Sequence, residues 1–446
     1  MELMNRTSSR LALALAAGLL MTGSALTSAK AADLGGDCCT DLEERVAALE
    51  ATTVTHGTRK MSLKISGWVN AAMLFWNDNG DGADNRDAGF HDHNSGFYVV
   101  NTSTAQSRFS LEGSAKVRED LSAGFSISVR PWGDKLSDVT QINANPTENN
   151  VDIRDTYVFL DFKHLGKFQL GQQASAADSA WYQDLGGSST WISNINPGAW
   201  GSSFYLRDVN GDLSTLQWGA LLGELSDAQA PRLAYYSRQV DGFQAAASVG
   251  SQTWALALYY AQKYGTVSVS AGVGYDVSYG SAALVGQNVG AGLVDAGDTR
   301  LAKLGASGSI YESRSGLYGT AGYSLAASDV DGRNDATNAY GKLGWRRNVN
   351  GMGETNLYGE YDRTSQALNN DVNAHVLGVG LTQDIDATAS VLYLGYRHAT
   401  LETDVVGGSL IATSKQGSTC GCSLDPAATV AGQNFDAVMG GMVVQF

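Results

Sequence analysis

Residues 62–76, SLKISGWVNAAMLFW, alternate between apolar and polar positions over most of their length. The apolar positions are Leu63, Ile65, Gly67, Val69, Ala71, Met73 and Phe75, and the opposite face carries Ser62, Lys64, Ser66, Trp68 and Asn70. Successive side chains of a β-strand point to opposite faces of the sheet. The stretch therefore predicts a strand with one apolar face and one polar face.

The same alternation recurs along the chain. In residues 121–130 and 266–275, apolar side chains alternate with serine, glycine and one arginine. Counting such segments predicts sixteen strands, at 62–76, 97–117, 121–131, 151–162, 166–173, 231–238, 242–250, 252–262, 265–275, 301–313, 316–327, 337–347, 354–364, 374–383, 388–400 and 434–446. An even number lets both ends of the chain lie on one side of a closed barrel.

The connections alternate in length, and this separates a membrane barrel from a soluble sandwich, whose strands also alternate. Short turns are expected near residues 118–120, 163–166, 239–241, 263–265, 314–316, 348–353 and 384–386, with one more tight connection near Ser251. Longer polar loops are expected near 77–96, 132–150, 174–230, 276–300, 328–336, 365–373 and 401–433. Short turns at one end and long loops at the other are typical of outer-membrane barrels.

Sixteen strands enclose a lumen too wide for side chains to fill, so it holds water or a plug. The apolar face then meets lipid, where a Lys or Arg at the midplane would cost about 2–4 kcal/mol. In the clearest strands the basic residues fall on the polar face, and all 5 prolines fall in predicted loops or at strand ends. The predicted fold class is all-β, a 16-stranded antiparallel transmembrane β-barrel.

The first 31 residues are predicted to be a cleaved signal peptide. Arg6 and Arg10 precede the uncharged apolar run 11–21, and Ala-Lys-Ala at 29–31 fits a small-residue cleavage site. The apolar run is too short to span a bilayer, which needs roughly 20 residues.

Residues 32–61 are predicted to form a periplasmic segment before the barrel domain, residues 62–446. Within it, residues 41–53 predict a short amphipathic helix, with Leu42 and Val46 on its apolar face. Fewer than two heptads is marginal for an isolated helix. The helix is therefore either part of a coiled coil between several copies of the chain or a solvated leader.

Charge and cysteine usage narrow the class of partner. The formal net charge is −15, and −17 once Glu2 and the three basic leader residues are removed, which argues against nucleic acid. The 4 cysteines form two close pairs, Cys38-Cys39 and Cys420-Gly-Cys422. Such pairs can form disulfides in an exported protein, but the sequence leaves their connectivity open. No metal ion and no cofactor is predicted.

The sequence ends at Phe446, preceded at steps of two by Val444 and Met442. A terminal aromatic residue with alternating apolar residues predicts a signal read by the barrel-assembly machinery. This signal bears on the barrel class and not on the function.

The chain resembles the trimeric porins of alphaproteobacterial outer membranes. The resemblance covers nearly the whole mature chain, although each matching piece by itself is only moderately specific. The pieces are ADLGGDCC at 32–39 with DLEERV at 41–46, KISGWVN at 64–70, SRFSLEG at 107–113, LGKFQLGQ at 165–172, and RLAYY at 232–236 with DGF at 241–243.

This resemblance implies a homotrimer of sixteen-stranded barrels, embedded in outer-membrane lipid and lipopolysaccharide, that passes small hydrophilic solutes and ions. It also implies that the third long loop, residues 174–230, folds inward as a constriction whose acids face arginines on the wall. The acids are Asp178, Asp184, Asp208 and Asp212, followed by Glu224 and Asp227. The wall candidates are Arg108, Arg130 and Arg154, of which Arg154 has ambiguous facing.

Other functions stay open at this point. A barrel enzyme would need a nucleophile or an activated water with a nearby base, and only His91-Asp92-His93 offers such a local group. A substrate-specific channel would line its path with aromatic residues, and the third loop contains Trp181, Trp191, Trp200, Phe204 and Tyr205. A gated channel or an adhesin is a further alternative. The acidic balance predicts weak cation preference, although screening over ~8 Å limits the reach of loop charges.

Overall fold

The computed structural model describes residues 53–56, 59–80, 94–102, 105–131, 136, 139–144, 151–193, 200–207, 213–222, 229–279, 300–328, 334–366, 372–402, 430 and 432–446. The predicted signal peptide, the predicted helix up to residue 52, all four cysteines and His91-Asp92-His93 lie outside these ranges. No helix within them is long and apolar enough to cross a membrane.

Nearly all of the regular structure is β-strand. The strands are β1 Thr53–His56, β2 Arg59–Asn77, β3 Ser95–Val100, β4 Arg108–Arg118, β5 Leu121–Pro131, β6 Val151–Phe162, β7 Gly166–Gln173, β8 Tyr205–Arg207, β9 Leu213–Gln217, β10 Ala230–Ser237, β11 Phe243–Gly250, β12 Thr253–Tyr264, β13 Val267–Tyr279, β14 Arg300–Glu312, β15 Leu317–Ser328, β16 Ala336–Arg347, β17 Thr355–Ser365, β18 Asn373–Ile385, β19 Ser390–Leu401 and β20 Asn434–Gln445. The described part also contains the 3-10 turns η2 Asp178–Trp181, η4 Trp218–Ala220 and η5 Asp386–Thr388.

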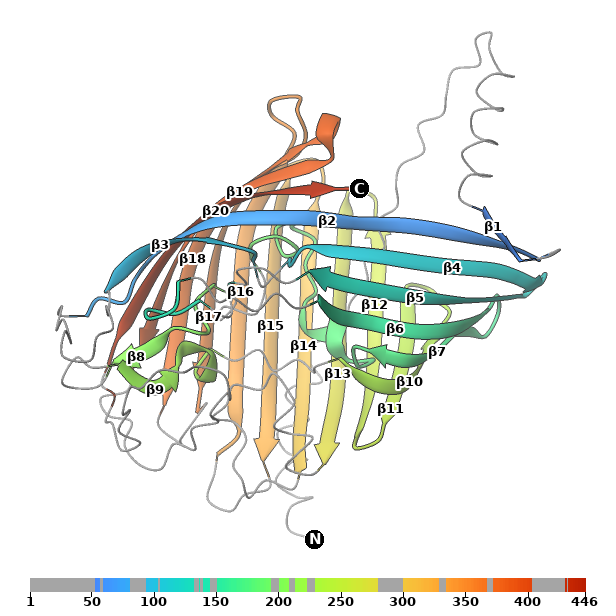
Figure 1. Cartoon of the computed structure of the whole chain (residues 1–446), viewed down its shortest axis with the longest axis horizontal. Coiled ribbons are helices and arrows are strands. Elements are labelled where there is room, and N and C mark those ends of the chain that lie inside the picture. Colours follow the sequence, from blue (N-terminus) through green and yellow to red (C-terminus); the bar gives the residue numbers. More distant parts are fainter. Residues whose placement is uncertain are drawn as a thin grey trace.

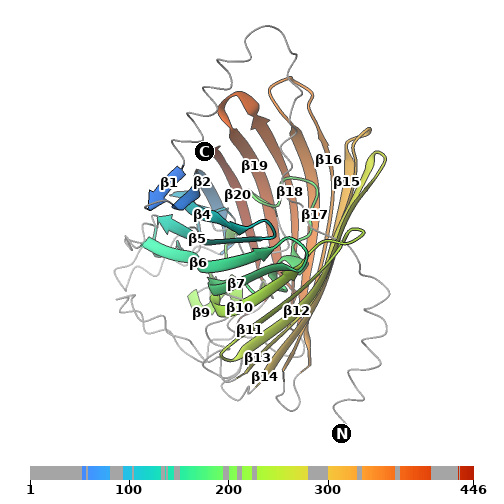
Figure 2. The ribbon, with the colours of Figure 1, turned by 90° about the vertical axis from the view of Figure 1, so that its right-hand side faces the viewer.

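The wall strands form one closed antiparallel sheet. Each pairs with its neighbour in the sequence, β7 pairs with β10 across the third connection, and β2 pairs with β20 to close the ring. Because β3 and β4 follow one another along β2, the wall has sixteen positions, as predicted. Figure 1 shows β2 and β4–β6 crossing in front of β13–β17, and Figure 2 shows these two walls from the side.

The two faces of the wall differ as the alternation predicts. On β2, Val69 and Met73 are 60% and 51% exposed, whereas Leu74 is fully buried. The exposed side chains form an apolar outer surface that continues around the barrel, for example at Leu343 and Leu394. The inner face carries serines, glycines and isolated charged residues, many of them buried.

Two details differ from the predicted strands. A single strand was predicted over residues 97–117, but β3 and β4 are separated by residues 101–107. The side chain of Asn70 on β2 occupies the gap: its Nδ2 donates to Thr102 Oγ1 at 2.6 Å and to the Ala105 carbonyl at 2.8 Å. These bonds replace ladder bonds locally. The first wall strand also begins at Arg59 rather than Ser62, and β1 pairs with its start.

Candidate functional site

The third connection, between β7 and β10, lies against the polar face of the wall. Its first part is held by serine hydroxyls that accept backbone N–H groups. Ser248 Oγ accepts from Ala176 at 3.0 Å, Ser307 Oγ from Gln183 at 2.8 Å, and Ser309 Oγ from Leu185 at 3.0 Å. Small polar residues at alternate wall positions therefore satisfy the backbone of a segment that has no strand partner.

Turn η2 packs one large side chain against β14. Trp181 is 3% exposed, and its indole lies where Gly305 has no side chain. A Cβ atom at Gly305 would lie 1.4 Å from Trp181 Nε1. Glycine at this wall position is therefore required by the close approach of the indole.

A buried ion pair joins the connection to β16. Lys342 Nζ donates to Asp184 Oδ2, and both side chains are almost completely buried. Thr320 Oγ1 donates to Asp184 Oδ1 at 2.8 Å, and the Gly186 N–H does so at the same distance. Burial alone would raise the pKa of Asp184, but the charge of Lys342 and these hydrogen bonds hold that pKa below its ordinary value.

A second buried ion pair follows on β17 and β19. Arg397 Nε donates to Glu360 Oε1 at 2.8 Å, and Ser193 of the connection donates to Glu360 Oε2. The Arg397 guanidinium lies 4.7 Å from the ring centroid of Trp200. The connection thus supplies both a hydroxyl and an aromatic face to a wall ion pair.

The later part of the connection is held by apolar contacts. Phe204 is fully buried, with its ring centroid 4.9 Å from that of Trp76 on β2 and 5.0 Å from that of Phe435 on β20. Next to these rings, Arg207 Nη2 pairs with Asp78 at 2.9 Å. Because Trp181, Trp200 and Phe204 are buried, these aromatic side chains anchor the connection and do not line an aqueous path.

The predicted basic residues lie on another part of the wall, on β4, β5 and β6. Arg130 forms an ion pair with Asp152, and Arg154 Nε lies 3.5 Å from Asp155 Oδ2. The ambiguous facing of Arg154 has a structural cause. The register between β5 and β6 shifts so that Ser128 and Val129 oppose Asp155 and Ile153, which leaves Arg154 as the extra residue of a β-bulge.

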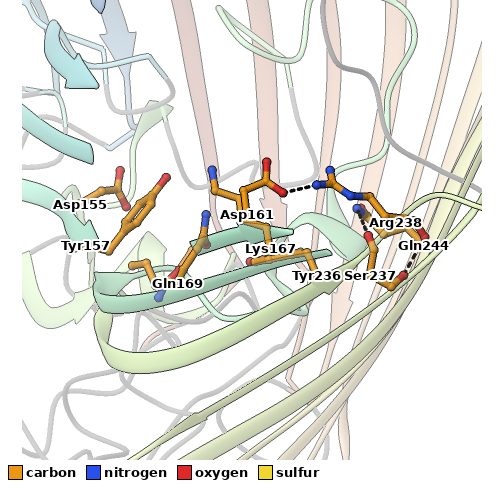
Figure 3. A pocket seen from close by; sticks show the side chains of 11 residues that line it. Asp155, Tyr157, Asp161, Lys167, Gln169, Tyr236, Ser237, Arg238 and Gln244 are labelled. Atoms are coloured by element: carbon orange, nitrogen blue, oxygen red, sulfur yellow. Dashed lines mark hydrogen bonds and ion pairs between the residues drawn. The ribbon is translucent and has the colours of Figure 1, made fainter. Parts of the chain in front are cut away.

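A polar hollow of about 430 Å³ opens on the inner face of β6, β7, β10 and β11 (Figure 3). Arg238 and Asp161 form an ion pair across its wall. The hollow is lined by Asp155, Tyr157, Asp161, Lys167, Gln169, Gln173, Ala174, Tyr236, Ser237, Arg238 and Gln244. Side chains of this kind suit water and hydrophilic solutes rather than an apolar ligand.

The structure places some predicted site residues and not others. Asp178 begins η2. Asp184 is paired with Lys342 rather than with an arginine. Asp208, Asp212, Glu224 and Asp227 lie outside the described residues. The opposition of loop acids to wall arginines, and the assembly role of Met442, Val444 and Phe446, remain predictions.

Sequence reasoning missed the wall residues that hold the third connection: Lys342, Glu360 and Arg397. A signal for them was present, because each is a charged residue at an inner position of the alternation, as are Arg346 and Asp362 on the same strands. A charged residue at an inner position of a wide barrel needs either water or a partner. The sequence does not say which of the two it meets.

Comparisons with known proteins agree with this architecture. A family model described as Gram-negative porin matches residues 12–404. An anion-selective porin from Comamonas acidovorans is 16% identical, with a TM-score of 0.52, over 86% of this chain and 100% of that one. The outer-membrane expressed OmpT of Vibrio cholerae is 12% identical, with a TM-score of 0.51, over 88% and 100%. At such identities the likeness shows the fold alone. No curated protein sequence matches the chain.

Proposed function

Since the chain belongs to the Gram-negative porin family, we propose that the third connection narrows its pore and selects small hydrophilic solutes and ions. The protein is an outer-membrane β-barrel channel for passive diffusion and is not an enzyme. The observation that carries the proposal is the course of the third connection. Its described part is bound to the inner face of the wall by the Asp184–Lys342 ion pair, among other contacts, and a polar hollow remains beside it.

We further propose that the protein is a homotrimer of the alphaproteobacterial branch, exported by a cleaved signal peptide and folded by the barrel-assembly machinery. These points rest on the resemblance of its motifs and on residues 1–31. Contacts with lipopolysaccharide belong to the same proposal. The barrel, with its apolar outer surface, is the part that meets lipid.

Conductance across a planar bilayer tests the channel proposal. Detergent-folded protein should give ohmic current steps in multiples of three, as expected for three parallel pores. The order of permeation should follow solute size, as expected for passive diffusion through a water-filled pore. A low conductance blocked by one sugar would favour a substrate-specific channel. Folded trimers that carry no current would overturn the proposal.

If the outer face of the barrel meets lipid, a charged residue placed on it should lower stability by an amount that depends on its depth in the bilayer. Leu394 lies in the middle of β19, on the face that meets lipid, and is 53% exposed. We expect Leu394→Arg to lower the free energy of unfolding by about 2–4 kcal/mol, and Thr400→Arg, near the end of the same strand, by about 0–1 kcal/mol. Guanidinium unfolding of protein held in lipid vesicles measures both. Equal costs at the two depths would contradict the face assignment.

A further inference from the structure

We propose that the polar hollow on the inner face of β6, β7, β10 and β11 is a subsite for neutral polyhydroxylated solutes, such as sugars of disaccharide size. The inference rests on the proposed channel function and adds a solute class to it. The observations that carry it are the position and shape of the hollow, the balance of its charges, and the polar groups in it that form no hydrogen bond within the described protein.

The hollow lies between the third connection and the periplasmic end of the wall (Figure 3). Asp161 and Arg238 line it next to the short connections 163–165 and 238–242, and short connections lie at the periplasmic end of such barrels. Ala174, the first residue after β7, lines it where the third connection leaves the wall. A solute that has passed the third connection on its way inward therefore meets the hollow next.

The shape of the hollow suits an elongated small molecule. Asp155 and Asp161 both line it from β6, and their separation along an extended strand is about 20 Å. The volume of about 430 Å³ leaves room for two linked sugar rings and their water. Tyr157 and Tyr236 add ring faces to the lining, against which the apolar C–H face of a sugar ring can pack.

The charges in the lining cancel. Its carboxylates are those of Asp155 and Asp161, and its basic groups are those of Lys167 and Arg238. Asp161 forms an ion pair with Arg238, whose Nε also donates to the Phe162 carbonyl at 2.9 Å. These bonds fix the guanidinium and leave it little capacity for an anion. The hollow therefore has no excess charge of either sign to attract an ionised solute.

Several polar groups in the lining are free to bind a solute. Within the described part of the chain, the amide of Gln169 and the hydroxyl of Tyr236 form no hydrogen bond. Lys167 forms no ion pair with the described residues, and its Nζ lies 4.1 Å from the ring centroid of Phe159. Contact with this aromatic face positions the ammonium group. The free groups come from neighbouring strands, because Lys167 on β7 pairs with Tyr236 on β10.

A sugar matches this set of groups better than an ion does. Each sugar hydroxyl donates one hydrogen bond and accepts up to two, so a sugar needs donors and acceptors side by side. Gln169 and Tyr236 offer both, and Lys167 offers donors. An ionised solute would lose more hydration free energy than a hydroxyl on entering the hollow, and it would find no surplus counter-charge there.

Two matched pairs of variants test the subsite. Gln169→Leu removes an amide that lines the hollow, and Gln172→Leu makes the same change on the same strand at a side chain that does not line it. Tyr236→Phe removes only a hydroxyl from the hollow. Tyr235→Phe removes the neighbouring hydroxyl, which donates to the Leu165 carbonyl and does not line the hollow. Far-UV circular dichroism and the heat-dependent mobility of the oligomer in gels establish that each variant is folded.

Saturation-transfer difference NMR measures the binding of sucrose to the detergent-folded protein. We expect the wild type to bind sucrose with a Kd in the millimolar range. Gln169→Leu should raise that Kd by about fivefold or more, and Tyr236→Phe by about threefold, because each leaves a sugar hydroxyl without its partner. Gln172→Leu and Tyr235→Phe should change the Kd by less than about twofold, since their side chains do not face the solute.

Planar bilayers measure how far sucrose lowers the potassium chloride current. Because the hollow lies on the wall, a bound sugar should narrow the pore without closing it. Poly(ethylene glycol) of the same hydrodynamic radius is the control solute, since it carries ether oxygens but no neighbouring hydroxyl groups. We expect sucrose to lower the current more than this control does, and Gln169→Leu to remove most of the difference.

Equal sucrose binding in Gln169→Leu and Gln172→Leu would overturn the subsite. A wild-type channel that conducts but gives no saturable transfer signal with sucrose would also overturn it, while leaving the channel function intact. If inorganic phosphate or glycylglycine bound more tightly than sucrose and lost that binding in Gln169→Leu, the neutral solute class would be wrong. Sucrose binding to folded protein that carries no current would overturn the channel function, and with it the role of the hollow in passage.

Discussion

We expect Lys342→Met to lower the free energy of unfolding by about 3–5 kcal/mol, because it leaves the buried carboxylate of Asp184 without its counter-charge. Among the described residues, Thr320 and the Gly186 N–H would then be the only groups that donate hydrogen bonds to this buried carboxylate. The third connection should loosen from β16 as a result. Guanidinium unfolding of the protein in lipid vesicles at pH 7 gives the stability, and single-channel noise reports the loosened connection.

The double variant Asp184→Asn/Lys342→Met is the matched control. It removes both charges and keeps the shape of the pair, so we expect it to recover at least half of the lost stability. A double variant as unstable as the single one would show that the methionine disrupts packing rather than electrostatics. Such a result would contradict the role given to the ion pair.

The pH dependence of this pair has a defined sign. In the wild type the pKa of Asp184 lies below its ordinary value of 3.8. The carboxylate therefore contributes stability that is present above pH 3.8 and is lost as the pH falls through the lowered pKa. In Lys342→Met the pKa of Asp184 should instead be raised. The difference in unfolding free energy between that variant and the wild type should then become smaller as acidification protonates the carboxyl.

Gly305→Leu should reduce single-channel conductance by roughly half or more, because overpacking at this position must move the indole. A Cβ atom there would lie 1.4 Å from Trp181 Nε1. The wall of β14 lies behind the indole, so η2 can move only away from the wall, toward the pore. Conductance in planar bilayers, with gel mobility as the folding control, measures the effect.

Two further variants identify the cause of that reduction. Gly341→Leu also adds a side chain to a wall glycine, but a Cβ atom at Gly341 would meet nothing within 4 Å. We expect its conductance to equal that of the wild type. Gly305→Leu/Trp181→Ala removes the clashing indole and should restore much of the current. If the double variant conducted as little as Gly305→Leu alone, the contact with the indole would not be what positions the third connection.

Much of the fold was readable from the sequence, because alternation with a period of two is a local property of the backbone. The strand predicted at 151–162 matches β6, and that at 121–131 matches β5. Turn positions followed for the same reason, since short polar interruptions such as residues 163–165 end one alternating run and start another. The barrel class therefore needed no knowledge of which strand lies beside which.

The site depended on contacts between distant residues, and only the tertiary structure decided those. In the break between β3 and β4, Thr102 and Ala105 accept hydrogen bonds from Asn70, which lies in another strand. The facing of Arg154 depends on a bulge that exists only in the pairing of β5 with β6. Asp184 meets Lys342 across 158 positions of the sequence. Alternation predicts the face of the sheet on which a side chain lies. The partner of that side chain depends on strand register, on bulges and on the course of the third connection, whose sequence has no repeating pattern.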